Sequence, residues 1–383
     1  MPGSVYIACG GTGGHLAPGI ATAQRLMEQG VEVVLVVSDR DVDSRLMQAY
    51  PDIPSLCQRG RAFGWKPQRL LPFCFCLFFS LFSSWQLVRR ERPRLILAFG
   101  GFMSVSLVLA GRLAGVPVIL HEANRKPGRS VRILSRMSEA VFLPEGVPCR
   151  SVEPRRLHRL GLPVRREVVH IPKEAIRKKL DIPLRAKVLL VVGGSQGAAS
   201  LNDWVRRRQR LLAADGIWVL LVSGPGKLEL PPVQRLSSDA GEPVEIRCFA
   251  FHNALHELFS CADVVVSRAG AGTIAEMAVC LAPGILVPYP HATDNHQLAN
   301  ASYLERRGGC ILIEEDKLES LYREVLDLIY NDWMLAQMRK NLRALSKEDA
   351  AGKLARFILS QHLDENGQQD FAGAAMREEV PRG

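Results

Sequence analysis

Hydrophobic residues along the chain fall into short continuous runs, separated by segments long enough for helices. The runs cover residues 5–11, 31–39, 94–101, 117–124 and 140–144 in the first half, and 187–194, 216–224, 244–251, 263–270, 284–290 and 310–314 in the second. Because they are continuous rather than alternating, they are typical of strands buried on both faces of a parallel sheet. Their alternation with helical segments predicts βαβ units with right-handed crossovers.

The two halves of the chain begin alike. A strand, a glycine-rich turn and a helix are expected at 8–19 and again at 191–200, which predicts an α/β protein of two Rossmann-like domains. Prolines interrupt a basic segment at 161–183, so we place the domain boundary there, with the domains at 1–164 and 165–362. Whether the last helix packs back on the N-terminal domain stays open. Residues 363–383 lack periodicity, and we expect a disordered tail.

One apolar run is long enough to raise the question of a membrane. Residues 70–88 contain no charged side chain, and this length approaches that of a membrane-spanning helix. Only a few residues separate the run from the buried strand at 94–101, so a spanning helix would pull that strand out of its sheet. We therefore expect a helix that lies on the protein surface.

The faces of this helix differ. On a helical wheel the large aromatic residues form one stripe, and a second face suits packing on the sheet through Leu77, Leu81, Ser84 and Val88. Either a second layer of protein covers the stripe, or the stripe enters a bilayer interface beside basic residues that meet anionic headgroups. The stripe is Phe75, Phe78, Phe79, Phe82 and Trp85, and the basic residues are Arg69, Arg89, Arg90, Arg92 and Arg94.

Charge and cysteine content narrow the classes of partner. The net charge of +10 suggests an anionic partner, such as an acidic membrane, a phosphorylated substrate or nucleic acid. Nucleic acid is disfavoured because the aromatic residues form one apolar stripe and do not interleave with Arg and Lys. The nine cysteines show no CxxC or Cys/His spacing, which indicates no metal site and a reducing cytoplasm. The first residues enter a strand at once, so we expect no signal peptide.

Two glycine loops suggest phosphate binding. The first runs from Gly10 to His15 and the second from Gly193 to Ala198, and each comes between a strand and a helix. The first loop is no dinucleotide fingerprint, because the third glycine of that pattern would fall on Leu16. His15 would act as a base or cap the helix. Two such loops, one in each domain, imply a cleft with an anion site on either side.

Two further segments carry candidate ligands. Small residues from Ala269 to Gly272 end a strand and open a helix that could hold a diphosphate. Glu276 would accept hydrogen bonds from ribose hydroxyls, or would be only a favourable charge in the first helical turn. Residues 287–301 form a polar segment whose carboxylate and amides suit sugar hydroxyls: Asp294, Asn295, Gln297 and Asn300.

Six motifs occur in the order seen in the MurG family, and the chain resembles that family from residue 4 to about residue 360. They are GGTGGH, FGG at 99–101, HEAN at 121–124, GGSQGA, SRAGAGTIAE and DNHQLANA. The resemblance implies a GT-B fold, in which two Rossmann-like domains with parallel sheets face a central cleft. It implies an inverting glycosyltransferase without metal or cofactor. The enzyme would move GlcNAc from UDP-GlcNAc to the 4-hydroxyl of undecaprenyl-diphosphate-linked muramyl peptide, lipid I, giving lipid II for peptidoglycan synthesis.

The resemblance also implies site residues and a location. His15, Asn124 and Glu276 would form the catalytic set, with His15 assisting removal of the acceptor proton. The substrate-binding residues would be Thr12, Gly13, Gly14, Asn124, Arg165, Ser195, Ala250, Ala271, Gly272, Thr273, Ile274, Ala275, Glu276 and Gln297. Ser195 would contact the diphosphate, Gln297 the GlcNAc hydroxyls and the backbone of Ala250 the uracil. The protein would be peripheral, at the cytoplasmic face of the inner membrane, with cell-wall or division proteins as partners.

The sequence departs from the family pattern mainly on the acceptor side. Phe102 stands where the family usually has tyrosine, Leu162 where it has asparagine, and Ala123 where it has glutamine. These departures leave an alternative open, a GT-B transferase that moves a UDP-sugar to a different membrane lipid. A third hypothesis is a peripheral membrane-binding protein that has lost turnover. Intact His15, Ser195, Glu276 and Gln297 argue against it.

Overall fold

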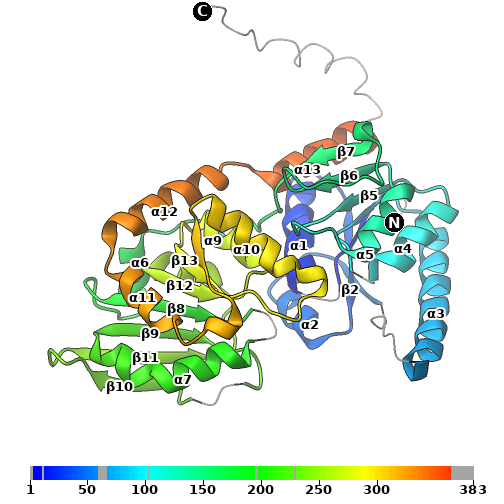
Figure 1. Cartoon of the computed structure of the whole chain (residues 1–383). Coiled ribbons are helices and arrows are strands. Elements are labelled where there is room, and N and C mark those ends of the chain that lie inside the picture. The colour runs from blue at the N-terminus through cyan, green and yellow to red at the C-terminus, as the bar shows by residue number, and fades with distance from the viewer. Residues whose placement is uncertain are drawn as a thin grey trace, which may run out of the picture.

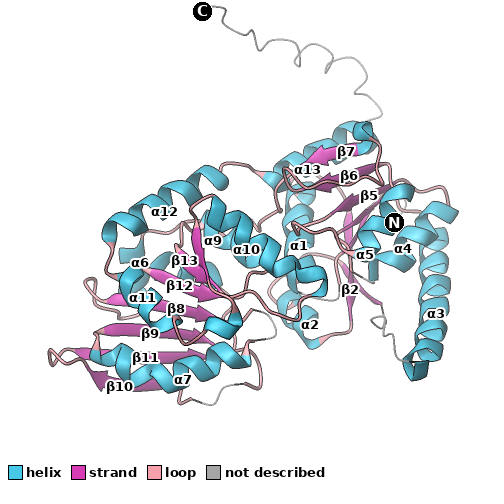
Figure 2. Cartoon of the chain, viewed as in Figure 1, coloured by secondary structure: helices cyan, strands magenta, loops and turns pink. Residues whose placement is uncertain are grey.

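The chain folds into two α/β domains that stand side by side (Figure 1). The computed structural model describes residues 3–10, 13–58, 67–101, 103–194, 197–227 and 230–363. Each domain has a central layer of strands with helices on either side (Figure 2). This architecture confirms the prediction of two Rossmann-like domains. The tail expected at 363–383 lies outside the described residues, apart from Leu363.

A seven-stranded sheet of order β3-β2-β1-β4-β5-β6-β7 forms the N-terminal domain. All neighbouring strands are parallel. Two of the strands, β3 and β7, were not predicted, because they are short edge strands whose side chains are mostly exposed or half-buried. The strands are β1 (Val5–Ala8), β2 (Val33–Ser38), β3 (Ser55–Gln58), β4 (Leu95–Ala98), β5 (Val118–His121), β6 (Ala140–Leu143) and β7 (Leu157–Arg159).

The C-terminal domain has a second seven-stranded sheet, of order β10-β11-β9-β8-β12-β13-β14. Its strands are parallel except for β10, which pairs antiparallel with β11 at one edge. The sequence did not predict β10, whose side chains alternate between exposed and half-buried. The strands are β8 (Lys187–Val192), β9 (Ile217–Val222), β10 (Val233–Ser237), β11 (Pro243–Phe249), β12 (Val264–Ser267), β13 (Gly284–Leu286) and β14 (Cys310–Leu312).

Helices cover both sheets. Those of the N-terminal domain are α1 (Gly13–Met27), α2 (Asp41–Met47), α3 (Pro67–Glu91), α4 (Met103–Leu113) and α5 (Arg129–Leu134). Those of the C-terminal domain are α6 (Lys173–Lys179), α7 (Ala199–Ala214), α8 (Leu255–Cys261), α9 (Ala271–Val279), α10 (His296–Arg306), α11 (Leu321–Ile329) and α12 (Asp332–Leu345). The last helix, α13 (Ala350–Ile358), crosses back and packs through Leu354 and Ile358 into the N-terminal core (Figure 1).

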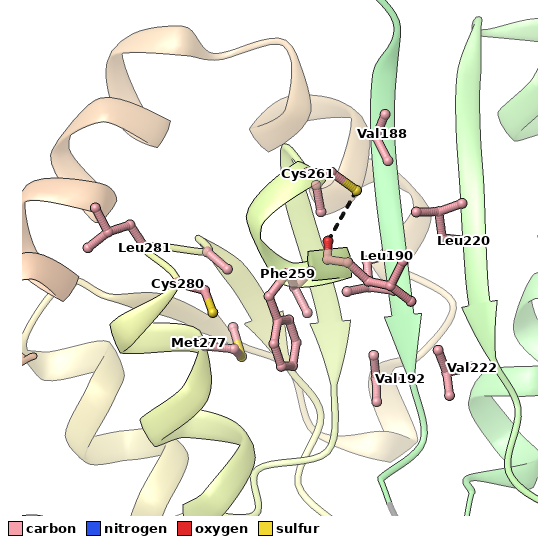
Figure 3. Packing of buried hydrophobic residues seen from close by; sticks show 14 of the residues in the cluster. Val188, Leu190, Val192, Leu220, Val222, Phe259, Cys261, Met277, Cys280 and Leu281 are labelled. Atoms are coloured by element: carbon pink, nitrogen blue, oxygen red, sulfur yellow. Dashed lines mark hydrogen bonds between the residues drawn. The ribbon is translucent and has the colours of Figure 1, made fainter. Parts of the chain in front are cut away.

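The cores lie on both faces of each sheet, as the continuous hydrophobic runs require. In the C-terminal domain, side chains of β8 such as Leu190 pack against Phe259 of α8 and Met277 of α9 (Figure 3). Cys261 in this core donates a hydrogen bond to the carbonyl oxygen of Leu258 (Figure 3). Burial raises the pKa of the Cys261 thiol to about 12, so this cysteine stays protonated and serves packing.

The strand order places both glycine loops at equivalent positions. In each sheet the chain order reverses at one point, between β1 and β4 in the first and between β8 and β12 in the second. Ligands of open α/β sheets bind at such points, outside the carboxyl ends of the strands. The loop of Gly10 follows β1, and the loop of Gly193 follows β8. Each domain therefore presents its glycine loop at its own switch point.

Helix α3 packs on α4 with one face and exposes another. Ser80, Ser84 and Val88 are buried, whereas the side chains of Phe79 and Phe82 are 53% and 47% exposed. Trp85, of the same stripe, is half-buried: it packs partly against the sheet core, and its ring lies 4.9 Å from the Arg89 guanidinium carbon. The side chains of Phe75 and Phe78 lie outside the described residues. Of the helices in the described ranges, none combines the length and apolar character that crossing a membrane requires.

Candidate active site

His15, in the first turn of α1, lies against the loop that follows β4. A Cβ atom on Gly101 would lie 3.2 Å from Nδ1 of His15 and 3.3 Å from its Cε1. Gly100 and Gly101 have φ angles of +84° and +77°, a region that residues with a Cβ rarely adopt. Glycine is therefore needed at both positions of the FGG motif, because the backbone has positive φ angles and passes close to the imidazole.

The environment of His15 favours its neutral form. Burial lowers its pKa and nearby His296 adds to this effect, while the carboxylates of Glu122 and Asp43 oppose it. The net direction is downward, so the imidazole is unprotonated at neutral pH. A neutral imidazole is the form that can accept a proton, as the base interpretation of this histidine requires.

Glu122, just after β5, organises the HEAN loop. One of its carboxylate oxygens accepts hydrogen bonds from both the backbone and the side-chain nitrogen of Asn124, each at 2.9 Å. The other oxygen accepts a bond from the backbone nitrogen of Gly128 at 2.7 Å. Glu122 is buried, so these bonds hold the orientation of the Asn124 amide.

Asn300, in α10, connects this loop to the C-terminal domain. Its Nδ2 donates to Oδ1 of Asn124 at 3.1 Å and to the carbonyl oxygen of Ala269 at 3.2 Å. Its Oδ1 accepts a bond from the backbone nitrogen of Arg125 at 2.9 Å. Sequence reasoning assigned Asn300 to sugar hydroxyls, but the structure uses its amide to join the two domains.

Arg165 and Glu276 form a second junction. Nη2 of Arg165 lies 2.9 Å from Oε1 of Glu276, and Nη1 donates to the hydroxyl of Tyr50 at 3.0 Å. Burial opposes the charge on Arg165, but Glu276 and Tyr50 outweigh it and raise the arginine pKa. Glu167 in turn accepts hydrogen bonds from Tyr50 and from Gln24 of α1. The guanidinium is thus held between Tyr50 of the N-terminal domain, Glu167 of the domain linker and Glu276 of α9.

The position of Glu276 excludes one of its two predicted roles. The residue lies in the second turn of α9, and the first turn contains no acidic residue, so the alternative of a first-turn charge is wrong. The side chain is 13% exposed. Thr273, Ile274 and Ala275 lie half-buried beside it.

The backbone at the start of α9 leaves open space for a ligand, whereas the second glycine loop is closely packed. A Cβ atom on Gly272 would meet no atom within 4 Å, which leaves room over the first turn, where Ala271 begins the helix. In the second loop a Cβ atom would lie 2.2 Å from backbone atoms at both Gly193 and Gly197, so these positions require glycine. The amides at the start of α9 suit a phosphate group.

Several predicted residues are placed only in part. Thr12 and Ser195 lie outside the described residues, and only the backbone of Gly13 is described. Gly14 is exposed at the start of α1, and Ala250 is exposed directly after β11. Oε1 of Gln297 accepts a bond from the backbone nitrogen of Tyr289 at 2.9 Å.

Asp294 faces the other domain. Its Oδ2 lies 2.7 Å from Nη2 of Arg132 in α5, so the carboxylate predicted to bind sugar hydroxyls forms an interdomain ion pair. Asp294 and Asn295 both have φ of +54°, within η3 (Thr293–Asn295) and directly before α10. This tight turn brings the residues before α10 close to α5.

Two residues that hold site residues in place, Tyr50 and Glu122, were not predicted from the sequence, and neither has a strong sequence signal. Tyr50 precedes an edge strand, and nothing near it in sequence marks it as a partner of Arg165. Glu122 lies within the HEAN motif, so that motif could have identified it. Within the described ranges no three His, Cys, Asp or Glu side chains come together as metal ligands would.

Comparison with protein-family models finds two matches in this chain. Residues 5–143 match the glycosyltransferase family 28 N-terminal domain, and residues 188–354 match the glycosyltransferase family 28 C-terminal domain. A protein of Opitutus terrae named UDP-N-acetylglucosamine–N-acetylmuramyl-(pentapeptide) pyrophosphoryl-undecaprenol N-acetylglucosamine transferase is 45% identical over 344 residues. That alignment covers 90% of this chain and 91% of the relative.

Solved structures share the fold at lower identity. The MurG structure from Acinetobacter baumannii superposes with a TM-score of 0.70 at 24% identity, covering 94% of this chain and 99% of that one. A structure from Listeria monocytogenes, described as a UDP-N-acetylglucosamine 2-epimerase, reaches a TM-score of 0.66 at 14% identity, covering 95% and 98%. These likenesses confirm the GT-B fold. They do not distinguish transfer from epimerisation.

Proposed function

The chain belongs to glycosyltransferase family 28, and from this premise we propose that it transfers GlcNAc from UDP-GlcNAc to the muramyl 4-hydroxyl of undecaprenyl-diphosphate-MurNAc-peptide, giving lipid II for peptidoglycan. The name of the Opitutus terrae relative supports this donor and acceptor. The observation that carries the proposal is the half-buried His15 at one switch point, whose lowered pKa favours the neutral form, together with Glu276 and the open start of α9 in the other domain.

His15 acts as the general base in this proposal. Its neutral imidazole takes the proton of the acceptor 4-hydroxyl while that oxygen attacks the anomeric carbon of GlcNAc. The bond between this carbon and the UDP oxygen breaks on the opposite face, so the configuration inverts. Asn124, which Glu122 and Asn300 hold in place, is positioned beside this reaction to orient a substrate hydroxyl.

The C-terminal domain holds the donor in this proposal. The amides at the start of α9 bind the diphosphate, together with Ser195 of the second glycine loop. Glu276 accepts bonds from the ribose, the amide of Gln297 binds GlcNAc hydroxyls and the backbone of Ala250 meets the uracil. Arg165 stabilises the charge that develops on UDP, so the reaction needs no metal.

The exposed face of α3 attaches the enzyme to the membrane that carries its acceptor. Phe79 and Phe82 are about half exposed, and Arg89 and Arg90 are exposed at the end of the same helix. Aromatic side chains beside arginines suit the interface of an anionic bilayer. The enzyme is then peripheral, at the cytoplasmic face of the inner membrane, where cell-wall and division proteins are accessible as partners.

UDP release from UDP-GlcNAc tests the proposal. We would measure it with and without a lipid I analogue, in EDTA, for the wild type and for His15→Ala. Acceptor-dependent release that persists in EDTA and falls in the variant supports the transfer and the role of His15. Release without an acceptor would indicate hydrolysis or epimerase-like chemistry. Donor binding without release on lipid I would instead favour transfer to another membrane lipid.

A further inference from the structure

A basic pocket opens beside the candidate active site, at the junction of the two domains. It has a volume of about 810 Å³ and lies between the loops that follow β5 and β6, α5 and the turn at η3. A second pocket of about 420 Å³ shares Lys126 and Asn295 with it and extends toward α10. Together the two pockets form one groove, which we call the basic groove. Its cations are Lys126, Arg132, Arg136 and Arg150, with Arg125 and Arg306 at the α10 end.

Several cations of the basic groove have no acidic partner. Arg132 pairs with Asp294, but among the described residues no carboxylate lies within ion-pair distance of Lys126, Arg136 or Arg150. These three side chains are exposed, so packing does not explain their positions. Like charges gathered around a hollow repel one another, and a bound anion would offset that repulsion.

The basic groove is connected to the residues of the reaction. Lys126 follows Asn124 by two positions, and the same Glu122 that holds Asn124 also accepts a bond from Gly128 at the end of this loop. At the other end, Oδ1 of Asn300 accepts a hydrogen bond from the backbone nitrogen of Arg125. The loop that carries Asn124 therefore also carries part of the groove lining, so a ligand in the groove would lie near a sugar bound next to Asn124.

The lining of the groove tells which part of the acceptor reaches it. None of the lining residues comes from α3, whose Phe79 and Phe82 are about half exposed, and most of the charged side chains in the groove are cations. The muramyl residue carries two arms, a lipid diphosphate and a peptide. The lipid arm belongs on the α3 side.

We propose that the basic groove binds the carboxylates of the peptide carried by the acceptor. This inference rests on the proposed function and adds a subsite to it. The larger pocket alone, at about 810 Å³, lies within the range of about 300–1,000 Å³ that is usual for ligand sites. The lining is mixed, because Pro127, Pro148 and Leu298 lie among the cations. Such a lining suits a short peptide that carries carboxylates.

Two acceptors and two double variants of the full chain test the inference. The acceptors are short-prenyl-diphosphate muramyl peptides, one with free peptide carboxylates and one with those carboxylates converted to amides. The variant Arg136→Gln/Arg150→Gln removes two charges from the groove. The control Arg185→Gln/Arg210→Gln removes two exposed charges from the C-terminal domain, far from the groove. KM for each acceptor, KM for UDP-GlcNAc and kcat are measured at one ionic strength.

The groove variant should raise KM for the free-carboxylate acceptor by about 2- to 30-fold, as the loss of two exposed charge pairs implies. It should leave KM for the amidated acceptor and for UDP-GlcNAc unchanged, and amidation should raise KM of the wild type similarly. Equal effects on both acceptors would assign the groove to the diphosphate or to lipid headgroups and overturn the proposal. No effect on either acceptor would also overturn it, while leaving the transferase function intact. A wild type that transfers to neither acceptor would refute the proposed function itself.

Discussion

Arg165 holds the carboxylate of Glu276, with Nη2 and Oε1 2.9 Å apart and both side chains nearly buried. The pair joins the linker between the domains to α9 of the C-terminal domain. Tyr50 of the N-terminal domain accepts a hydrogen bond from the other Nη atom of the same guanidinium. The guanidinium thereby connects α9 with the N-terminal domain.

Glu276→Gln should weaken UDP-GlcNAc binding by about ten- to a hundredfold, because a hydrogen bond to a charged group contributes about 1.5–3 kcal/mol. The neutral amide also removes the nearer of the two carboxylates that pair with the buried Arg165, at 2.9 Å against 3.8 Å for Glu167, so the melting temperature should fall. Isothermal titration with UDP-GlcNAc and thermal melts measure both effects. Glu319→Gln, in an exposed pair with Arg208, is the control. Unchanged donor affinity in Glu276→Gln would remove this residue from the donor site.

Asn300→Asp should lower kcat and destabilise the protein. The aspartate still accepts the Arg125 amide, but it loses both donated bonds and places a charge beside Oδ1 of Asn124. An unpaired buried polar group costs about 1–3 kcal/mol, so we expect a loss of that size in the free energy of unfolding. Chemical denaturation and steady-state kinetics provide the measurement. A variant with normal kcat would show that the Asn124 orientation does not depend on this contact.

The rate should depend on the protonation of His15. Its pKa is lowered chiefly by burial, so the neutral form persists below the ordinary histidine pKa of about 6.5. The acid limb of kcat/KM should therefore lie below pH 6.5, with activity falling as pH drops through the lowered pKa. His15→Gln should abolish that limb and reduce kcat by about 10²–10⁴. An acid limb that persists in His15→Gln would assign the base to another group.

Gly101→Ala should reduce activity through His15. The new Cβ would lie 3.2 Å from Nδ1 of the imidazole, and alanine at φ of +77° is strained. Strain of this kind costs about 1–3 kcal/mol of stability. Steady-state kinetics and denaturation should show both effects. Gly115→Ala is the control, because alanine there is similarly strained but its Cβ would have no atom within 4 Å. If both variants lose activity equally, the loss comes from strain alone and not from the contact with His15.

Phe79→Ser/Phe82→Ser should release the protein from anionic vesicles. Burying a phenylalanine side chain fully is worth about 1.5–3 kcal/mol, so losing two half-exposed rings should weaken binding at least about tenfold. Vesicle sedimentation measures binding, and titration should show unchanged UDP-GlcNAc affinity. Trp333→Ser, an aromatic residue exposed on the C-terminal domain, is the control. Vesicle binding that survives in the double variant would mean that α3 meets a protein partner.

The sequence predicted the buried parts of the fold more completely than the edges. Strands such as β1, β8 and β12 are almost fully buried, so each was visible as a continuous hydrophobic run. The edge strands β3, β7 and β10 were missed, since a strand with one neighbour and a solvated face needs no such run. The partial burial of Trp85 on α3 could not be predicted, because a helical wheel shows which residues share a stripe but not how far the sheet core extends beneath it.

Local features could be predicted from the order of residues, because glycine loops, helix starts and hydrophobic runs depend on neighbours in the chain. These features were sufficient for two Rossmann-like domains, the family and the candidate residues His15, Arg165 and Glu276. Contacts between segments that are distant in the sequence could not be predicted in this way. That Arg165 would hold Glu276, and that Asn300 would reach Asn124, follows from how α9 and α10 pack against the N-terminal domain. Such pairings depend on the packing of whole domains, which no local spacing encodes.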